Sequence, residues 1–521
     1  MKIFEEGEFM SCWMGIDVGT SGIKVIIIDE NGSVLGEGYA EQDVILLGEG
    51  YAEQNPLVWK DSCKAAIREA LKNKKSNQDV EAIGFSGQMQ GTVFLDKDDR
   101  PIRNCIIWMD QRAACEVGEI GTLLRASNVN GMEITANHCL NTFWAPKILW
   151  LKKHEPENFE KINKVLFPKD YLALWLTGEK AIEVSDASLT YLLDIQERKW
   201  SDSMFHALGI HKHIVPDRLL ESCHVVGKLR KIVAEEFGLK PGIPVIAGGG
   251  DQLANGIGTG IINENIMGVS IGTSAVVFGC SKTPFYDKSN SAIQSLCHAC
   301  PDLWAYLGLS LTAGASLKWI RETFFKREKK EYAQIGKDVY DYITGIASKT
   351  DVGSKGCVFL PYFNGDSAPN NDPNARACFF GMSLDTGMSE ICRSVLEGVS
   401  FSLRETLEVC RKMGKEIHTI RVSGGGAKSA LWRQIQADIF DASVVTMEIE
   451  EGPAAGAAIL AAVGCGFFQT VGEGCSAIVK TDTQTDPIPE NVKRYNEYFE
   501  LYHSLYRHLK EPFDVRAGLN L

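Results

Sequence analysis

The feature that most constrains the fold of this chain is a strand-turn-strand motif that occurs twice. Residues 14–29 (MGIDVGTSGIKVIIID) contain an apolar strand, a glycine-rich turn and a second strand of branched residues, and residues 267–277 (MGVSIGTSAVV) repeat the pattern. Each copy alone is equally compatible with an ordinary β-hairpin. Two separated copies predict two similarly folded halves that face each other.

The length of the chain supports this division. A chain of 521 residues is longer than one hydrophobic core usually supports. We therefore expect an α/β protein of two domains, residues 1–258 and 259–521, with a ligand cleft between them.

The two turns are candidate phosphate-binding loops. Gly19 and Gly22 allow the backbone to approach an anionic ligand, so that Thr20 and Ser21 can donate hydrogen bonds to phosphate oxygens. Asp17 precedes the first turn and could hold Mg²⁺, directly or through water. In the second copy, Gly272 and Thr273 would contact the same triphosphate from the other half.

Two further strands end in runs of glycine. The predicted strand 245–247 leads into Gly-Gly-Gly-Asp-Gln at residues 248–252, and the strand 419–422 leads into Ser-Gly-Gly-Gly-Ala-Lys at residues 423–428. Asp251 could project a carboxylate into the cleft, or it could cap the following helix. The second run suits a ligand at a helix N-terminus, with Gly425, Gly426 and Ala427 as candidates. Gly314 could line the same site or serve helix packing.

Composition excludes several classes of partner. The net charge of −13 argues against nucleic acid or an anionic membrane surface as the main partner. No apolar run is long enough to span a membrane. The fifteen cysteines show no complete zinc pattern, and no signal peptide precedes them, so we expect reduced thiols in the cytoplasm.

Three other patterns are interpreted as structural. The heptapeptide GEGYAEQ occurs at residues 36–42 and again at 48–54, which predicts two neighbouring strand-and-turn segments. Residues 452–465 are rich in alanine and glycine, which favours a tightly packed helix. Asp186 is interpreted as a helix cap.

Taken together, these stretches resemble the FGGY carbohydrate kinases. Residues 377–382 and 390–397 fit the second signature of that family, and residues 145–150 fit part of the first, in which Trp144 replaces a small residue. The loop at 248–251 resembles the one that carries the catalytic aspartate. The resemblance implies two ribonuclease-H-like domains of the actin and hexokinase superfamily, around a central cleft that binds ATP and Mg²⁺.

The sugar-side loops resemble most the xylulokinase branch of this family. The matching segments are GQMQG at 87–91, WMDQR at 108–112 and NDPNAR at 371–376. Three positions depart from that branch: Gln90 replaces a histidine, Met109 an asparagine, and Gln252 an asparagine, the last being closer to glycerol kinase.

The resemblance assigns a role to each candidate residue. Asp251 would be the general base, and Asp17 and Asp251 would hold Mg²⁺. Sugar binding is assigned to Gln88, Met89, Gln90, Trp108, Asp110, Arg112 and Gln252. Nucleotide binding is assigned to Gly19, Thr20, Ser21, Gly272, Thr273, Gly314, Gly425, Gly426 and Ala427. A core position for Trp108 remains an equal alternative.

The predicted activity is ATP-dependent phosphorylation of a ketopentose, with D-xylulose as the expected acceptor and D-xylulose 5-phosphate as product. Ribulose, L-xylulose or a polyol are alternative acceptors. A non-catalytic sugar or nucleotide sensor is the alternative from another class, but a sensor is expected to lack Asp17 or Asp251, and both are present. An ATP-driven protein clamp is disfavoured, since only about fifty residues follow Gly466. A homodimer is left open.

Overall fold

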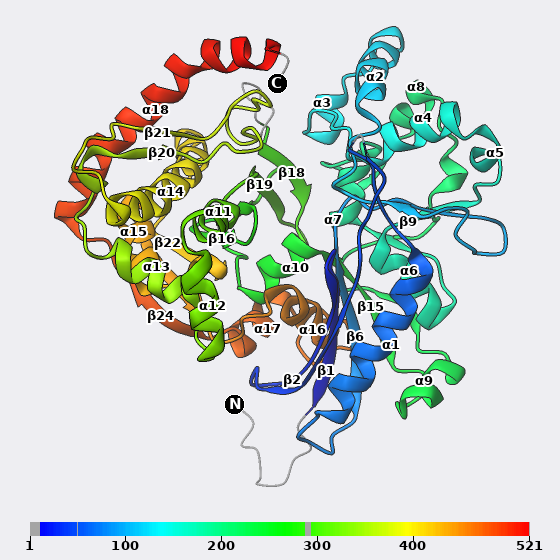
Figure 1. Cartoon of the computed structure of the whole chain (residues 1–521). Helices are drawn as coiled ribbons and strands as arrows, with labels where there is room; N and C mark the ends of the chain where they lie inside the picture. Colours follow the sequence, from blue (N-terminus) through cyan, green and yellow to red (C-terminus); the bar gives the residue numbers. More distant parts are fainter. Residues whose placement is uncertain (1–10, 49, 287–292, 520–521) are drawn as a thin grey trace.

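The computed structural model describes residues 11–48, 50–286 and 293–519, which form two large β-sheets with helices around and between them (Figure 1). The first sheet has the strand order β14-β15-β6-β1-β2-β3. Its strands are β1 (Cys12–Val18), β2 (Gly22–Asp29), β3 (Val34–Glu41), β6 (Val80–Gly87), β14 (Val225–Lys228) and β15 (Pro244–Gly250).

The second sheet has the order β18-β19-β17-β16-β22-β23-β24. Its strands are β16 (Ile266–Ile271), β17 (Ala275–Ser281), β18 (Ile293–Cys297), β19 (Trp304–Ser310), β22 (Thr419–Gly424), β23 (Ser443–Met447) and β24 (Thr481–Thr485). The centres of the two sheets match. In each, the first strand of a Gly-Thr-Ser hairpin pairs antiparallel with its hairpin partner and parallel with a later strand, β6 or β22. The prediction of two similarly folded α/β halves is confirmed.

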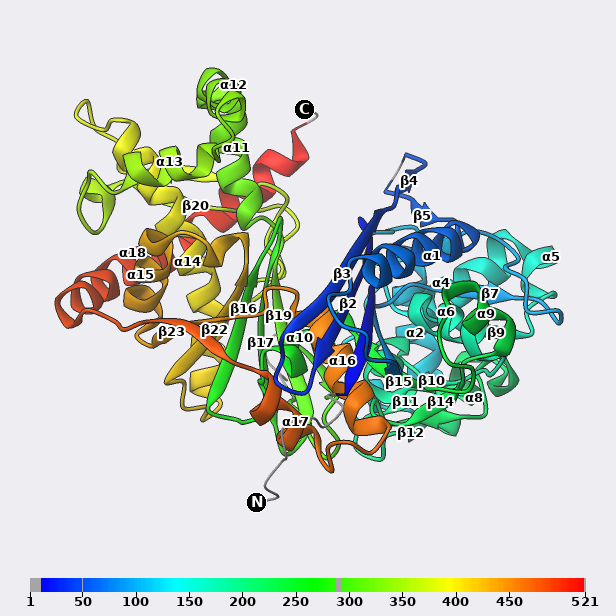
Figure 2. The ribbon, with the colours of Figure 1, turned by 90° about the horizontal axis from the view of Figure 1, so that it is seen from below.

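Two helices lie between the sheets, as Figure 2 shows. They are α10 (Asp251–Gly258) and α16 (Gly452–Gly464). Helix α16 packs directly on the first sheet, because a Cβ on Gly15 of β1 would lie 1.9 Å from the Ala454 carbonyl oxygen, and one on Gly84 of β6 would lie 2.0 Å from that of Ala457. The small residues of α16 are therefore needed for close packing, as predicted.

Other helices cover the outer faces. Helix α1 (Pro56–Lys72) packs on the outer side of the first sheet, and α14 (Met388–Lys412) and α15 (Ala430–Phe440) cover the second (Figure 2). Helix α18 (Pro489–Gly518) packs on α14 and α15. The predicted division at residues 258 and 259 falls at the end of α10 and stays a prediction, since α16 follows the second hairpin in sequence yet packs on the first sheet.

Shorter elements carry the loops beside the first sheet. The strands are β4 (Ile45–Leu46), β5 (Ala52–Gln54), β7 (Val93–Leu95), β8 (Cys105–Ile106), β9 (Lys164–Leu166) and β10 (Ile182–Glu183). The helices are α2 (Ala114–Ala126), α4 (Trp144–His154), α6 (Pro168–Thr177), α7 (Val184–Ala187) and α8 (Asp202–Leu208). In the part of the chain that the structure describes, no helix combines the length and apolar character needed to cross a lipid bilayer.

Candidate active site

The two predicted catalytic carboxylates lie at one edge of the first sheet. Strands β1, β6 and β15 are parallel, and their register aligns Asp17 with Ser86 and Ser86 with Gly249. Asp251 follows two residues later and is the first residue of α10, whose N-cap is Gly250. Asp251 is therefore not the N-cap of its helix. Carboxyl ends of parallel strands are the usual place for ligand-binding groups in α/β proteins.

Burial disfavours the charged forms of both acids, and a neighbouring negative charge adds to the effect on each, that of Glu451 for Asp17 and that of Asp17 for Asp251. Burial raises the pKa of Asp17 to about 6, against a hydrogen bond from the Ser86 hydroxyl at 2.8 Å. Burial, and then the negative charge of Asp17, raise the pKa of Asp251 to about 7, while hydrogen bonds from Gln252 oppose the shift. A cation between the two acids would favour their charged forms.

The first phosphate turn is joined to the predicted sugar loop by hydrogen bonds. The Thr20 hydroxyl donates to Gln88 Oε1 at 3.3 Å and accepts from Trp108 Nε1 at 2.9 Å. Ser21 is exposed, and its carbonyl accepts from the Tyr39 hydroxyl at 3.1 Å. The structure thus brings together Thr20 from the nucleotide set with Gln88 and Trp108 from the sugar set.

Most of the second nucleotide set lines one cavity of about 340 Å³. Gly272, Thr273, Gly314, Gly425 and Gly426 all border this space. Sequence reasoning missed its apolar wall, which comes from three further elements and includes Leu317, Tyr340 and Trp432. Trp432 lies six residues after Gly426, on α15, whose N-cap is Ser429. Its closeness in sequence to the glycine run could have indicated it.

Ala427 and Gly314 differ from the rest of this set. Ala427 borders a neighbouring cavity of about 560 Å³, which shares Gly425 and Lys428 with the first, and its contact with a nucleotide stays a prediction. Gly314 borders the first cavity and also packs tightly, since a Cβ there would lie 2.2 Å from the Gly272 carbonyl oxygen. Both alternatives for Gly314 thus have a structural basis.

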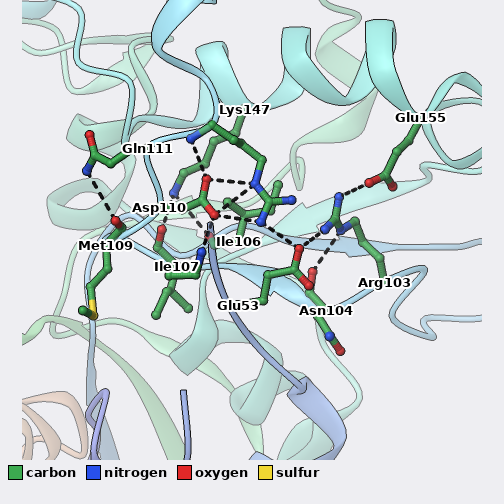
Figure 3. A network of polar contacts seen from close by, with 12 residues as sticks. Glu53, Arg103, Asn104, Ile106, Ile107, Met109, Asp110, Gln111, Lys147 and Glu155 are labelled. Carbon is green, nitrogen blue, oxygen red and sulfur yellow. Dashed lines mark hydrogen bonds and ion pairs between the residues drawn. The ribbon is translucent and has the colours of Figure 1, made fainter. Parts of the chain in front are cut away.

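Asp110 and Arg112 are buried. They belong to a polar network, of which Figure 3 labels Asp110 and Glu53. The Arg112 guanidinium pairs with Asp110 at 2.7 Å and with Glu53 at 2.8 Å, and it lies 4.3 Å from the centre of the Tyr51 ring. Asp110 also accepts from the backbone N–H of Ala52 at 2.6 Å. With their polar atoms engaged in this way, the two residues hold the loops beside the site, and their direct contact with a sugar stays a prediction.

A buried lysine joins the two sugar loops. Lys147 of α4 donates to the carbonyl oxygens of Gln90 at 2.8 Å and of Ile106 and Ile107 at 3.2 Å each (Figure 3). Burial lowers the pKa of this lysine to about 7. The three carbonyls fix the backbone of both loops relative to α4.

Two of the remaining sugar candidates, Met89 and Gln252, lie beside Asp251. Met89 packs on the backbone before it, since a Cβ on Gly250 would lie 2.7 Å from Met89 Cγ. Gln252 is its neighbour in sequence and hydrogen-bonds to its carboxylate. Gln90 has a left-handed backbone with φ of 66°, and its side-chain amide has no hydrogen bond to any residue that the structure describes.

Sequence reasoning missed a buried charged cluster beside Asp251. Lys169 Nζ lies 2.7 Å from Asp170, 3.4 Å from Glu183 and 3.3 Å from Asp186, and all four side chains are almost fully buried. The cluster connects to the catalytic loop, because Ser185 Oγ donates to Glu183 at 2.8 Å and accepts from the N–H of Gly250 at 3.2 Å.

The interpretation of Asp186 as a helix cap is wrong. The cap of α7 is Glu183, whose carboxylate accepts from the N–H groups of Ser185 and Asp186. The polar contact of the Asp186 carboxylate is the ion pair with Lys169, and burial raises its pKa well above the usual range although Lys169 opposes the shift.

Comparison with known proteins identifies the family. The model for the N-terminal domain of the FGGY family of carbohydrate kinases matches residues 12–258, and the model for the C-terminal domain matches residues 267–465. The chain is 36% identical to a xylulose kinase of Bacillus subtilis, over 96% of this chain and 97% of the relative, and 38% identical to one of Escherichia coli, over 87% and 90%.

Solved structures agree with the sequence comparison. The fold is similar to that of a crystal structure described as a xyloylose kinase from Brucella ovis, with 32% identity, a TM-score of 0.85, and coverage of 96% of this chain and 99% of the other. A ligand-bound xylulose kinase from Lactobacillus acidophilus has 25% identity and a TM-score of 0.87 over 96% and 98%. The chain therefore belongs to the FGGY family of carbohydrate kinases.

Proposed function

We propose that this kinase transfers the γ-phosphoryl group of ATP to O5 of D-xylulose. The observation that carries the proposal is the position of Asp251 beside Asp17, where β1, β6 and β15 end next to the first Gly-Thr-Ser turn. The acceptor is supported by the xylulose kinases to which the chain is similar over most of its length.

The residues divide the reaction between them. Asp251 accepts the proton of the sugar hydroxyl while the hydroxyl oxygen bonds to the γ-phosphorus. ADP leaves with the electron pair of the broken bond between phosphorus and the bridging oxygen. Thr20 and Ser21 contact the phosphates from one side, and Gly272 and Thr273 do so from the other. The cavity walled by Leu317, Tyr340 and Trp432 accommodates the adenosine.

Asp17 and Asp251 fit a magnesium ion. They are two desolvated carboxylates whose charges repel, and oxygen is the ligand atom that this ion prefers. No group of three or more His, Cys, Asp or Glu side chains suited to a metal exists among the described residues, so phosphate oxygens and water would complete the shell. When bound, the ion neutralises charge on the triphosphate.

We also place the protein in the cytoplasm. All fifteen cysteines are free thiols, as expected in a reducing compartment. The homodimer stays a prediction.

A panel of sugars tests the proposed acceptor. ADP release from ATP and Mg²⁺ should be measured with D-xylulose, L-xylulose, D-ribulose, L-ribulose and glycerol. We expect the highest kcat/KM with D-xylulose. A higher value with another sugar or polyol would reassign the acceptor, and no sugar-dependent ADP release would favour the sensor alternative.

Gln90→His should change the preference among pentuloses. The glutamine amide offers two donors and one acceptor on a flexible arm, whereas neutral imidazole offers one of each on a rigid ring. Leaving one buried polar group unpaired should change the ratio of kcat/KM values between two pentuloses by about ten- to a hundredfold. The same panel, run on the variant, measures the change. An unchanged ratio across the pentuloses would move the determinant to Met109, Asp110 or Gln252.

A further inference from the structure

We propose that Gln54 is a positioning residue that couples sugar binding to ATP binding, by joining the sugar loop to the first phosphate turn. The proposal rests on the proposed function, because it takes residues 87–91 as a sugar loop and Thr20 as part of a triphosphate site. Gln54 belongs to the second GEGYAEQ heptapeptide, for which the sequence indicated only a structural role.

Gln54 closes a hydrogen-bonded ring of three residues, Gln54, Gln88 and Thr20. Its Nε2 donates to the Thr20 carbonyl at 2.8 Å, and its Oε1 accepts from Gln88 Nε2 at 2.7 Å. The ring is completed by the Thr20 hydroxyl, which donates to Gln88 Oε1 at 3.3 Å. Every polar group of the two amides that faces the ring is therefore used, so movement of one member breaks a hydrogen bond of another.

Contacts outside the ring fix the position of Gln54. Gln54 is 1% exposed and lies on β5, and its Nε2 also donates to the Asp43 carbonyl at 3.2 Å. The residue before it, Glu53, points to the other face of the strand and pairs with Arg112 and Arg103 (Figure 3). Because β5 is fixed by these ion pairs, Gln54 is an anchored link between the two loops.

Gln54 contacts both the loop proposed to bind the sugar and the turn proposed to bind the triphosphate. Gln88 begins the loop that brings Met89 against Gly250, the residue before Asp251, while Thr20 is the first polar residue of the phosphate turn. A sugar that fixes the sugar loop in one conformation also fixes the position of the Gln88 amide. Through its hydrogen bonds to Gln54, the Gln88 amide then fixes the carbonyl of Thr20. The turn is then ordered before ATP binds, so the second ligand binds at a lower ordering cost.

The repeat supplies a matched control within the chain. Gln42 occupies the position in the first heptapeptide that Gln54 occupies in the second, and it is also buried. Neither its Nε2 nor its Oε1 has a hydrogen-bond partner within the described residues. Its backbone N–H donates to the Ser21 carbonyl, and this bond is independent of the side chain.

The test compares Gln54→Met with Gln42→Met in the full-length protein. Isothermal titration would give the Kd of a non-hydrolysable ATP analogue with Mg²⁺, with and without saturating D-xylulose. In the wild type we expect the sugar to tighten the analogue at least about fivefold, the lower end of typical coupling. The ratio of the Kd without sugar to the Kd with sugar should fall below twofold in Gln54→Met. In Gln42→Met this ratio should equal that of the wild type.

Gln54→Glu provides a second variant if the methionine variant does not fold. It keeps an oxygen for Gln88 Nε2 and removes the donor to the Thr20 carbonyl, so the coupling should again be lost. A wild-type ratio near one, or a full ratio in a folded Gln54 variant, would overturn the proposal. If the panel reassigns the acceptor, that sugar replaces D-xylulose in the titration, so failure of the proposed function and failure of the coupling remain distinguishable.

Discussion

Asp251→Asn should lower kcat by at least about 10²-fold, the lower limit for loss of a positioned general base. The amide has the shape of the carboxylate but cannot accept the proton of the sugar hydroxyl. Asp251 lies at the start of α10 among polar and small residues, so the substitution leaves the packing of that helix intact. The affinity for an ATP analogue without Mg²⁺ should therefore stay close to that of the wild type.

A matched substitution controls for the loss of an acid at a helix start. Asp202 is also the first residue of its helix, α8, but its side chain is 82% exposed. Asp202→Asn should leave kcat unchanged. Steady-state ADP release with saturating sugar measures both variants. If Asp251→Asn keeps kcat within about threefold of the wild type, Asp251 is not the base.

Lys169→Met should reduce the free energy of unfolding by about 3–5 kcal/mol, because it leaves buried carboxylates without their cation. Asp170, Glu183 and Asp186 all pair with this one lysine. Burial by itself would lower the pKa of Lys169, but the three acids raise it above the usual range, so the lysine is charged in the folded protein.

The loss should grow as the pH rises. Burial raises the pKa of Asp170 to about 6, so the folded state binds more protons than the unfolded state between about pH 4 and 6, and stability falls as the pH rises through that window. Without Lys169 the pKa values of the acids rise further, which extends the window upward. The difference between variant and wild type should therefore be larger at pH 8 than at pH 5.

Urea unfolding at both pH values tests this prediction. Lys240→Met is the control, because Lys240 pairs with Asp79 on the surface, and it should not change stability measurably at either pH. A loss below about 1 kcal/mol for Lys169→Met, or one that does not depend on pH, would contradict the assignment of the cluster as a paired buried network.

Local sequence was sufficient to predict the hairpins and the small-residue helix. A glycine turn between two apolar strands depends on residues that are adjacent in sequence, and both copies form as expected at β1-β2 and β16-β17. The alanines and glycines of α16 indicated close packing in the same way. The surface that α16 packs on was not predictable, since β1 and β6 lie far from it in the sequence.

The misses all depend on tertiary contacts. Lys169 and Asp186 are separated by a helix and a short strand, and charged residues in such a stretch are usually solvated, so nothing local indicates a buried cluster. The ion pair between Arg112 and Glu53 was not predictable either, since Glu53 comes from a distant strand.

Identification of the product tests the proposed function most directly. The wild-type protein, ATP, Mg²⁺ and D-xylulose should give one new phosphate monoester, and in a proton-phosphorus correlation spectrum its phosphorus should couple to the two protons on C5. Phosphorus coupled to protons on another carbon, or release of inorganic phosphate without a sugar phosphate, would contradict the account.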